Sequence, residues 1–202
     1  MVTWRSYHGS YESTEWDQQP AVRWQPQSSG HSRHVSEETF IPPVVITGWV
    51  HLESVDPQQP WDGVKVHLGH LGNNRNYVVD LVRPDNHMVI SREYGWRHYD
   101  DLDGSRRTDG LNLTQHGVYV FRIDWQPEFI RAEVANEIAT VAVEAQIKRV
   151  SEQGRSEGSH VPVIPFGSVG VRLDHITALG QLQVGWKQGD RPGREAVDVD
   201  CP

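Results

Sequence analysis

The sequence predicts an all-β protein whose main part is a two-sheet, antiparallel β-sandwich of the jelly-roll kind. Between residues 43 and 188, roughly nine short segments alternate apolar with polar residues. Most of these segments are separated by turns that contain Gly, Pro, Asn or Asp. No segment has the length and period of an ordinary helix, and evenly spaced short strands are typical of sandwiches and barrels.

The clearest predicted strand spans residues 44–53. Its Val, Ile and Leu residues lie on one side, and Thr47, Trp49, His51 and Glu53 lie on the other, which is the period of a half-buried strand. The same pattern predicts further strands at 64–68, 76–83, 87–93, 118–125, 128–134, 138–144, 168–174 and 181–187.

We expect three parts along the chain: an irregular N-terminal arm over residues 1–42, the β-sandwich domain over 43–188 and a polar C-terminal tail over 189–202. The first part has no clear period and contains Pro20 and Pro26, which disfavour a helix. Its tryptophans are expected to pack into the surface of the sandwich. The long loop 94–116 is a second place to look for function, because long loops in compact domains are often functional.

Composition excludes several classes of partner. The formal net charge is −8, and no basic stripe of the kind that binds nucleic acid is present. No apolar run approaches the roughly 20 residues needed to cross a membrane. The lone Cys201 forms no internal disulfide, and no signal-like apolar segment follows Met1, so we expect a cytoplasmic protein unless a leader has been removed. The oligomeric state stays open.

The sequence predicts no cofactor and no transition metal. It contains no P-loop, no dinucleotide fingerprint and no Gly-x-Ser-x-Gly turn. The pair His67 and His70 is too closely spaced for a well-formed site between strands. The acidic loop 100–104 has the oxygen-rich composition of a structural calcium site but lacks the full EF-hand spacing, so a solvated loop is the alternative.

The second half of the chain contains the predicted strand 119–125, the hairpin strand 129–134 and the segment Gly-Ser-Val-Gly-Val-Arg at 167–172. This pattern resembles the concanavalin A-like lectin/glucanase superfamily, of the laminin-G-like and glycoside hydrolase family 16-like type. It implies a sandwich in which one curved sheet forms a ligand groove. The catalytic carboxylates of that glycosidase family are not matched, because the closest acidic strand, at 133–137, lacks their spacing and is interrupted by Ala135. Lys148 stands where alginate lyase-like relatives carry His.

Residues that alternate out of the core are the candidates for a site. We expect His51, Asp80, His67 and Glu53 to do acid–base work, because histidine titrates near neutral pH and a carboxylate can orient it. His51 with Asp80 or Glu53 is the first candidate pair. The predicted ligand-binding residues are Trp49, Tyr94, Trp96, Arg92 and Arg172. On the fourth strand either Arg92 or Glu93 faces outward. The competing interpretation is that Trp49 packs under the N-terminal segment and His51 caps it.

These observations leave three functions open. The first is carbohydrate binding or processing, as a glycoside hydrolase, a polysaccharide lyase or a binding module. The alternative is a cytoplasmic small-molecule cyclase or isomerase of specialised metabolism that uses the same cleft for acid–base chemistry. The third is an interaction domain without chemistry. The expected partner is accordingly a saccharide or a small molecule.

Overall fold

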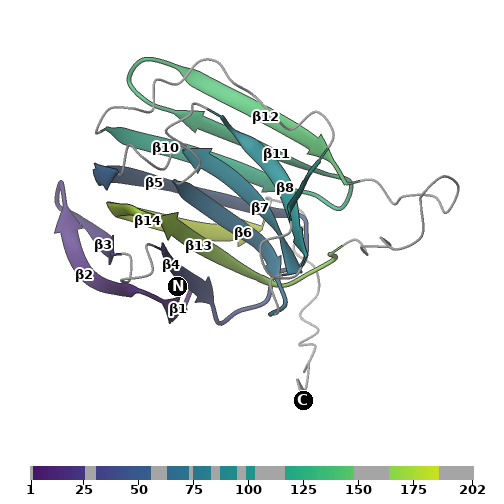
Figure 1. Cartoon of the computed structure of the whole chain (residues 1–202), viewed down its shortest axis with the longest axis horizontal. Helices are drawn as coiled ribbons and strands as arrows, with labels where there is room; N and C mark the ends of the chain where they lie inside the picture. The colour runs from purple at the N-terminus through teal and green to yellow at the C-terminus, as the bar shows by residue number, and fades with distance from the viewer. Residues whose placement is uncertain are drawn as a thin grey trace, which may run out of the picture.

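The computed structural model describes residues 2–25, 31–55, 63–72, 75–82, 87–94, 99–102, 117–147 and 164–186. Within these ranges the regular elements are β-strands, which form two antiparallel sheets of seven strands each. The sheets stack as a sandwich (Figure 1), which confirms the predicted all-β architecture. None of the described residues belongs to a helix that is long and apolar enough to span a membrane.

Sheet A contains, in spatial order, β1 (Trp4–His8), β4 (His31–Ser36), β13 (Ser168–Asp174), β6 (Val64–His70), β7 (Arg75–Val82), β8 (Val89–Tyr94) and β9 (Tyr99–Asp101). Sheet B contains β12 (Thr140–Gln146), β11 (Phe129–Ala135), β10 (Val118–Trp125), β5 (Val44–Val55), β14 (Ile176–Trp186), β3 (Gln19–Gln25) and β2 (Ser10–Trp16). The chain therefore passes between the sheets several times.

The hydrophobic core lies between the two sheets and is built by the alternation that the sequence shows. On β6, Val64, Val66 and Leu68 belong to the core cluster, so the intervening Lys65 and His67 point away from sheet B. On β10, the alternate residues Tyr119, Phe121, Ile123 and Trp125 are buried in the same cluster. This alternation places polar side chains on the outer side of each sheet.

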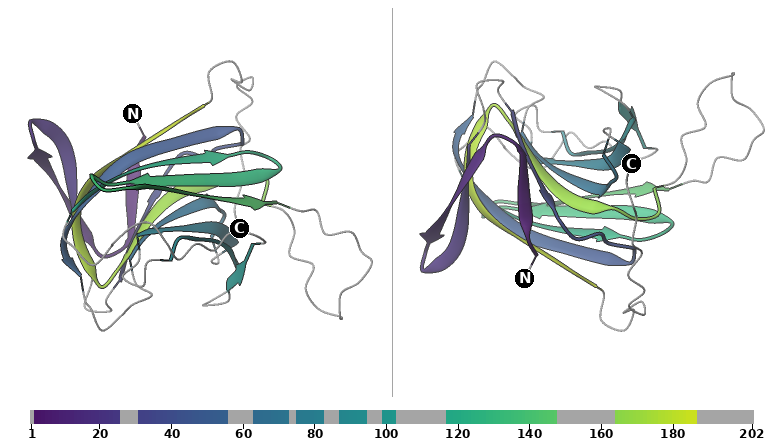
Figure 2. Two further views of the ribbon diagram at one scale, coloured as in Figure 1. Left: turned by 90° about the horizontal axis from the view of Figure 1, so that it is seen from above. Right: turned by 90° about the horizontal axis from the view of Figure 1, so that it is seen from below.

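The N-terminal segment differs from the expected irregular arm, because it forms β1, β2, β3 and β4. The β2–β3 hairpin lies at one side of the sandwich (Figure 2), and β4 lies inside sheet A between β1 and β13. β4 escapes prediction because its inward residues are Ser32, His34 and Ser36, which are buried without being apolar. The expected C-terminal tail lies outside the described residues.

Close packing of Trp24 on Gly180 generates the first prediction. A methyl group at Gly180 would come within 2.2 Å of the Trp24 ring and 2.6 Å of the carbonyl oxygen of Trp49. We expect Gly180→Ala to lower the free energy of unfolding by about 1–3 kcal/mol, the usual cost of overpacking a core. Gly185→Ala on the same strand is the control, because nothing lies within 4 Å of a Cβ there. Equal stability of the two variants in urea denaturation would contradict this packing.

The inward position of His34 makes the stability of the folded protein depend on pH. His34 is 2% exposed, neither of its ring nitrogens has a hydrogen-bond partner among the described residues, and the ring of Tyr11 meets it edge-on at 5.0 Å. Burial lowers the pKa of His34 from 6.5 to about 4. The unfolded chain therefore takes up a proton at His34 at a higher pH than the folded protein does, and folding becomes less favourable as the pH falls from 6.5 to 4.

We expect His34→Leu to remove this contribution. The stability difference between His34→Leu and the unmodified protein should then grow in favour of the variant as the pH falls from 6.5 to 4, and level off below that. Denaturant titrations of both proteins across this range measure the difference. A difference that does not change with pH would mean that His34 is protonated as easily when folded as when unfolded.

Candidate functional site

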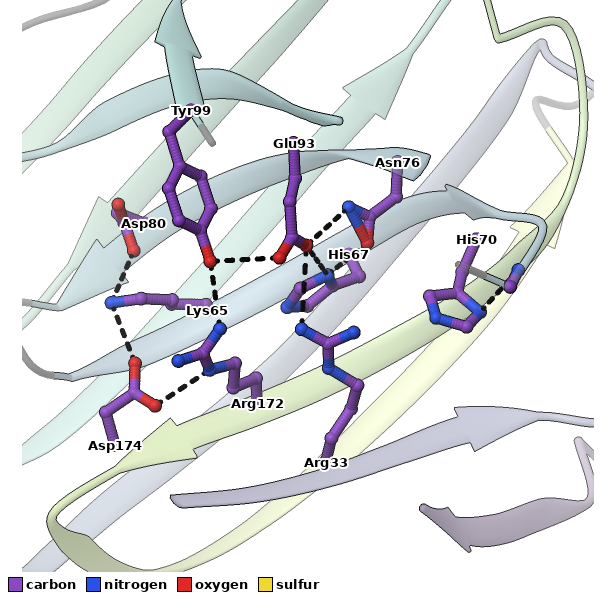
Figure 3. Close-up of polar contacts among 11 residues, drawn as sticks. Arg33, Lys65, His67, His70, Asn76, Asp80, Glu93, Tyr99, Arg172 and Asp174 are labelled. Carbon is purple, nitrogen blue, oxygen red and sulfur yellow. Dashed lines mark hydrogen bonds and ion pairs between the residues drawn. The ribbon is translucent and has the colours of Figure 1, made fainter. Parts of the chain in front are cut away.

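The outer face of sheet A carries a group of polar side chains from six neighbouring strands. We call this group the polar face (Figure 3). It is formed by Arg33 of β4, Lys65 and His67 of β6, Asn76 and Asp80 of β7, Glu93 of β8, Tyr99 of β9, and Arg172 and Asp174 of β13. Strand register brings these residues together, since Arg172 lies opposite both Arg33 and Lys65, and Glu93 lies opposite both Asn76 and Tyr99.

One half of the polar face is organised around Lys65. Its Nζ lies 2.8 Å from Oδ1 of Asp80 and 3.2 Å from Oδ2 of Asp174, while Nε of Arg172 donates to Oδ1 of Asp174 at 2.8 Å. Burial works against both charges, raising the pKa of Asp174 and lowering that of Lys65. The neighbouring opposite charges outweigh burial, so the pKa of Asp174 is held below its ordinary value and that of Lys65 above its own.

The other half is organised around Glu93, which is 2% exposed. Its Oε2 accepts from Nδ2 of Asn76 at 2.9 Å and lies 3.5 Å from Nη2 of Arg33. Its Oε1 accepts from the hydroxyl of Tyr99 at 3.1 Å. Burial raises the pKa of Glu93 although Arg33 and Tyr99 act in the opposite direction. The Tyr99 hydroxyl also accepts from Nη1 of Arg172 at 2.9 Å, and so joins the two halves.

His67 lies beside this second half and is fully buried. Its Nδ1 is hydrogen-bonded to Oδ1 of Asn76, and its Nε2 has no hydrogen-bond partner among the described residues. Burial, together with the charge of Arg33, lowers the pKa of His67 well below 6.5. The ring is therefore neutral at neutral pH.

The structure brings together three of the predicted site residues: His67, Asp80 and Arg172. It also decides between the two candidates on β8, since Glu93 joins the polar face whereas Arg92 points toward sheet B. The Arg92 guanidinium carbon lies 5.7 Å from the ring centroid of Tyr77, a core residue. The predicted ligand contact by Arg92 therefore does not fall on the polar face, because its charge is held over an aromatic ring.

Trp49, His51 and Glu53 lie on β5 of sheet B and face away from sheet A. The ring of Trp16 lies 4.7 Å from that of Trp49 and stacks on that of His51 at 5.2 Å, so the packing of Trp49 under the N-terminal segment is confirmed. Glu53 accepts from Arg23 of β3. The predicted pair of His51 with Asp80 is not formed. The alternation of apolar and polar residues indicates which side chains face away from the core, but it does not indicate to which sheet they belong.

The remaining predictions lie wholly or partly outside the described residues. These are the side chains of Tyr94 and Trp96, most of the loop 94–116, and residues 103 and 104 of the acidic loop. Within the described part of the chain, no group of three or more His, Cys, Asp or Glu residues is placed to hold a metal ion. The calcium hypothesis therefore stays a prediction.

Sequence reasoning missed Arg33, Asn76 and Tyr99. Arg33 lies on a strand whose inward residues are polar, and Tyr99 begins a strand of three residues, which is too short to recognise by alternation. Asn76 falls in a predicted strand and could have been placed by its period-2 relation to Asp80.

A second feature is a cavity of about 210 Å³ at one end of the sandwich. It is lined by Ile41, Pro42, Trp125, Pro127, Ile147, Ile164 and Pro165. These side chains carry no acid, base or charge. The cavity therefore has no group that could perform chemistry, and the polar face remains the better candidate.

Comparison with known proteins identifies the fold. No protein-family model matches the chain, and no curated protein matches its sequence. Among solved structures, the carbohydrate-binding module CBM66 from Bacillus subtilis superposes with a TM-score of 0.61 and 10% identity, over 91% of this chain and 96% of the module. The chain has a concanavalin A-like fold. This result confirms the resemblance seen in the second half of the sequence.

Two further structures have a similar backbone. One is a Bacillus subtilis protein of unknown function with a galectin-like fold (TM-score 0.58, 12% identity, 90% of this chain and 88% of that one). The other is the exoplasmic/lumenal domain of VIP36 in its Ca²⁺/Man3GlcNAc-bound form (TM-score 0.58, 9% identity, 94% and 86%). At such low identity, the likeness establishes the concanavalin A-like fold alone.

The contacts of Lys65 predict a large loss of stability when this residue is replaced. Lys65→Met leaves Asp80 and Asp174 buried without the cation between them, and we expect the free energy of unfolding to fall by about 3–5 kcal/mol. Arg131→Met is the control, since it breaks an exposed pair with Glu133 and should cost about 1 kcal/mol or less. Urea denaturation of both variants measures how much unfolding free energy each one loses. A similar loss in the two variants would contradict the prediction.

Proposed function

We propose that this protein binds a saccharide on the polar face of sheet A. The observation that carries the proposal is the fixed network of donors and acceptors that runs across five strands, from Lys65 through Arg172 and Tyr99 to Glu93, Asn76 and His67. A sugar presents several hydroxyl groups, each of which both donates and accepts hydrogen bonds. A network that is already ordered spends little conformational entropy when it binds such a ligand.

Accessibility favours one edge of the network as the point of contact. Tyr99 is 39% exposed, and the side chain of Arg172 is 20% exposed, whereas Lys65, His67 and Glu93 are buried. Tyr99 offers a ring and a hydroxyl at the same position, a combination that suits ligands with one apolar and one polar side. The charge-assisted hydrogen bonds behind it hold this hydroxyl in place.

The names of the similar structures support the same ligand class. One is a carbohydrate-binding module, and another is bound to Man3GlcNAc. These ligands belong to those proteins, and in this chain the polar face of sheet A offers the donors and acceptors that a saccharide would need.

Binding is better supported than hydrolysis. A glycoside hydrolase requires one carboxyl group that holds a proton and a second that acts as nucleophile or base. Glu93, whose pKa is raised by burial, resembles the first. Asp80 and Asp174 are both held by Lys65. The hydrolase, lyase and cyclase activities considered from the sequence therefore stay predictions.

A conservative change at the exposed edge tests the proposal. Tyr99→Phe keeps the ring but removes the oxygen that joins Glu93 to Arg172, and should weaken saccharide binding roughly three- to tenfold, the range expected for one hydrogen bond. Tyr11→Phe is the control, because Tyr11 is 41% exposed and its hydroxyl lies only 3.4 Å from the carbonyl oxygen of Trp4. A glycan array followed by calorimetry supplies the measurement. The proposal fails if no neutral or acidic glycan is retained.

A further inference from the structure

A second group of side chains continues the outer face of sheet A beyond the polar face. On β1, Arg5 lies opposite Val35 of β4, and Val35 has the same orientation as Arg33 because one residue separates them. Arg5 therefore faces the same side of the sheet as the polar face. Its guanidinium carbon lies 5.7 Å from the ring centroid of Tyr7, and that ring meets His70 of β6 edge-on at 5.6 Å. We call Arg5, Tyr7 and His70 the β1 corner.

The β1 corner is open to a ligand. Arg5 is exposed, and Tyr7 is 46% exposed. Apart from its contact with the Tyr7 ring, Arg5 makes no hydrogen bond or ion pair with the part of the chain that the structure describes. The five N–H donors of its guanidinium are therefore available, in the planar arrangement that suits a negatively charged group with two oxygens.

The electrostatics of the β1 corner are positive. Burial, followed by the charges of Arg33 and Arg5, lowers the pKa of His70 to about 4, and no carboxylate acts against these two cations. On the neighbouring polar face the cations contact as many carboxylates: Arg33, Lys65 and Arg172 against Asp80, Glu93 and Asp174. Arg5 therefore adds a positive charge that no described carboxylate on this side of the sheet balances by contact.

The β1 corner lies close to the exposed edge of the polar face. Register places Arg5 opposite Val35, and Val35 opposite Gly170 of β13. Arg172 follows two residues further along the same strand. With strands about 4.8 Å apart and about 3.3 Å per residue, the backbones of Arg5 and Arg172 are about 12 Å apart along the sheet. One oligosaccharide chain can therefore contact both arginines.

We propose that the β1 corner binds an anionic substituent of the saccharide, through the guanidinium of Arg5 and beside the exposed ring of Tyr7. The inference rests on the proposed function and narrows its ligand class to acidic oligosaccharides. The carboxylate of a uronic acid and a sulfate ester share the required chemistry, since both present negatively charged oxygens that accept from guanidinium N–H groups. The formal net charge of −8 repels polyanions in general, so this binding depends on the local cation.

The first experiment compares matched oligosaccharides by calorimetry. The probes have glucose, mannose or galactose backbones, each in neutral, uronic acid and sulfated form. We expect an acidic form to bind roughly five- to tenfold more tightly than its neutral counterpart, and the form that gains identifies the anionic group. Arg5→Gln should remove this gain and leave the affinity for the neutral form unchanged.

Arg131→Gln is the matched control, because it removes the same charge from an exposed site on β11 of sheet B. It should preserve the gain. Equal or weaker binding of both acidic forms, or a gain that persists in Arg5→Gln, overturns the inference while leaving saccharide binding intact. No binding of any probe overturns the proposed function and this inference together.

The second experiment needs no variant and therefore stands even if Arg5→Gln does not fold. ¹H–¹⁵N correlation spectra of the unmodified protein resolve the Nε–H signals of arginine side chains. We expect the acidic probe to shift the Arg5 signal and the neutral probe to leave it in place, while the Arg131 signal moves with neither. An Arg5 signal that does not move when the acidic probe is bound overturns the inference.

Discussion

The polar face depends on one interaction, the contact of the buried Lys65 ammonium with the carboxylates of Asp80 and Asp174. The three residues come from the adjacent strands β6, β7 and β13, so a single cation links the centre of sheet A. An isolated buried charge would be strongly unfavourable, and here the ammonium of Lys65 is balanced by the two carboxylates that it contacts. Arg172, which shares Asp174, extends this arrangement to Tyr99 and from there to Glu93.

This connectivity explains how side chains of opposite character coexist on one sheet. The inner side of β6 contributes Val64, Val66 and Leu68 to the core, and its outer side contributes Lys65 and His67 to the network. Both sides of β6 are buried. The inner side chains pack in the hydrophobic core, whereas the outer side chains are stabilised by hydrogen bonds and ion pairs. A face of this kind is costly to assemble and rigid once formed, and rigidity is the property that a binding site for a ligand rich in hydroxyl groups requires.

The sequence predicts the sandwich and the outward positions of His67, Asp80 and Arg172, because a period of two is a local property of each strand. Which strands share a sheet is not a local property, so the alternation does not show that His51 lies in sheet B and Asp80 in sheet A. β4 was missed because its inward residues include Ser32 and His34. Arg92 and Glu93 could not be separated because a long cation can lie over an aromatic ring inside the protein as well as face solvent.

The most direct test of the account is to locate the bound saccharide by amide chemical-shift perturbation, using a ligand found by array screening. The account predicts that the shifted amides cluster on β6, β7, β8, β9 and β13, around His67, Glu93 and Tyr99. Shifts that cluster instead on β5 and β2, around Trp49 and Trp16, would place the ligand on the outer face of sheet B and contradict it.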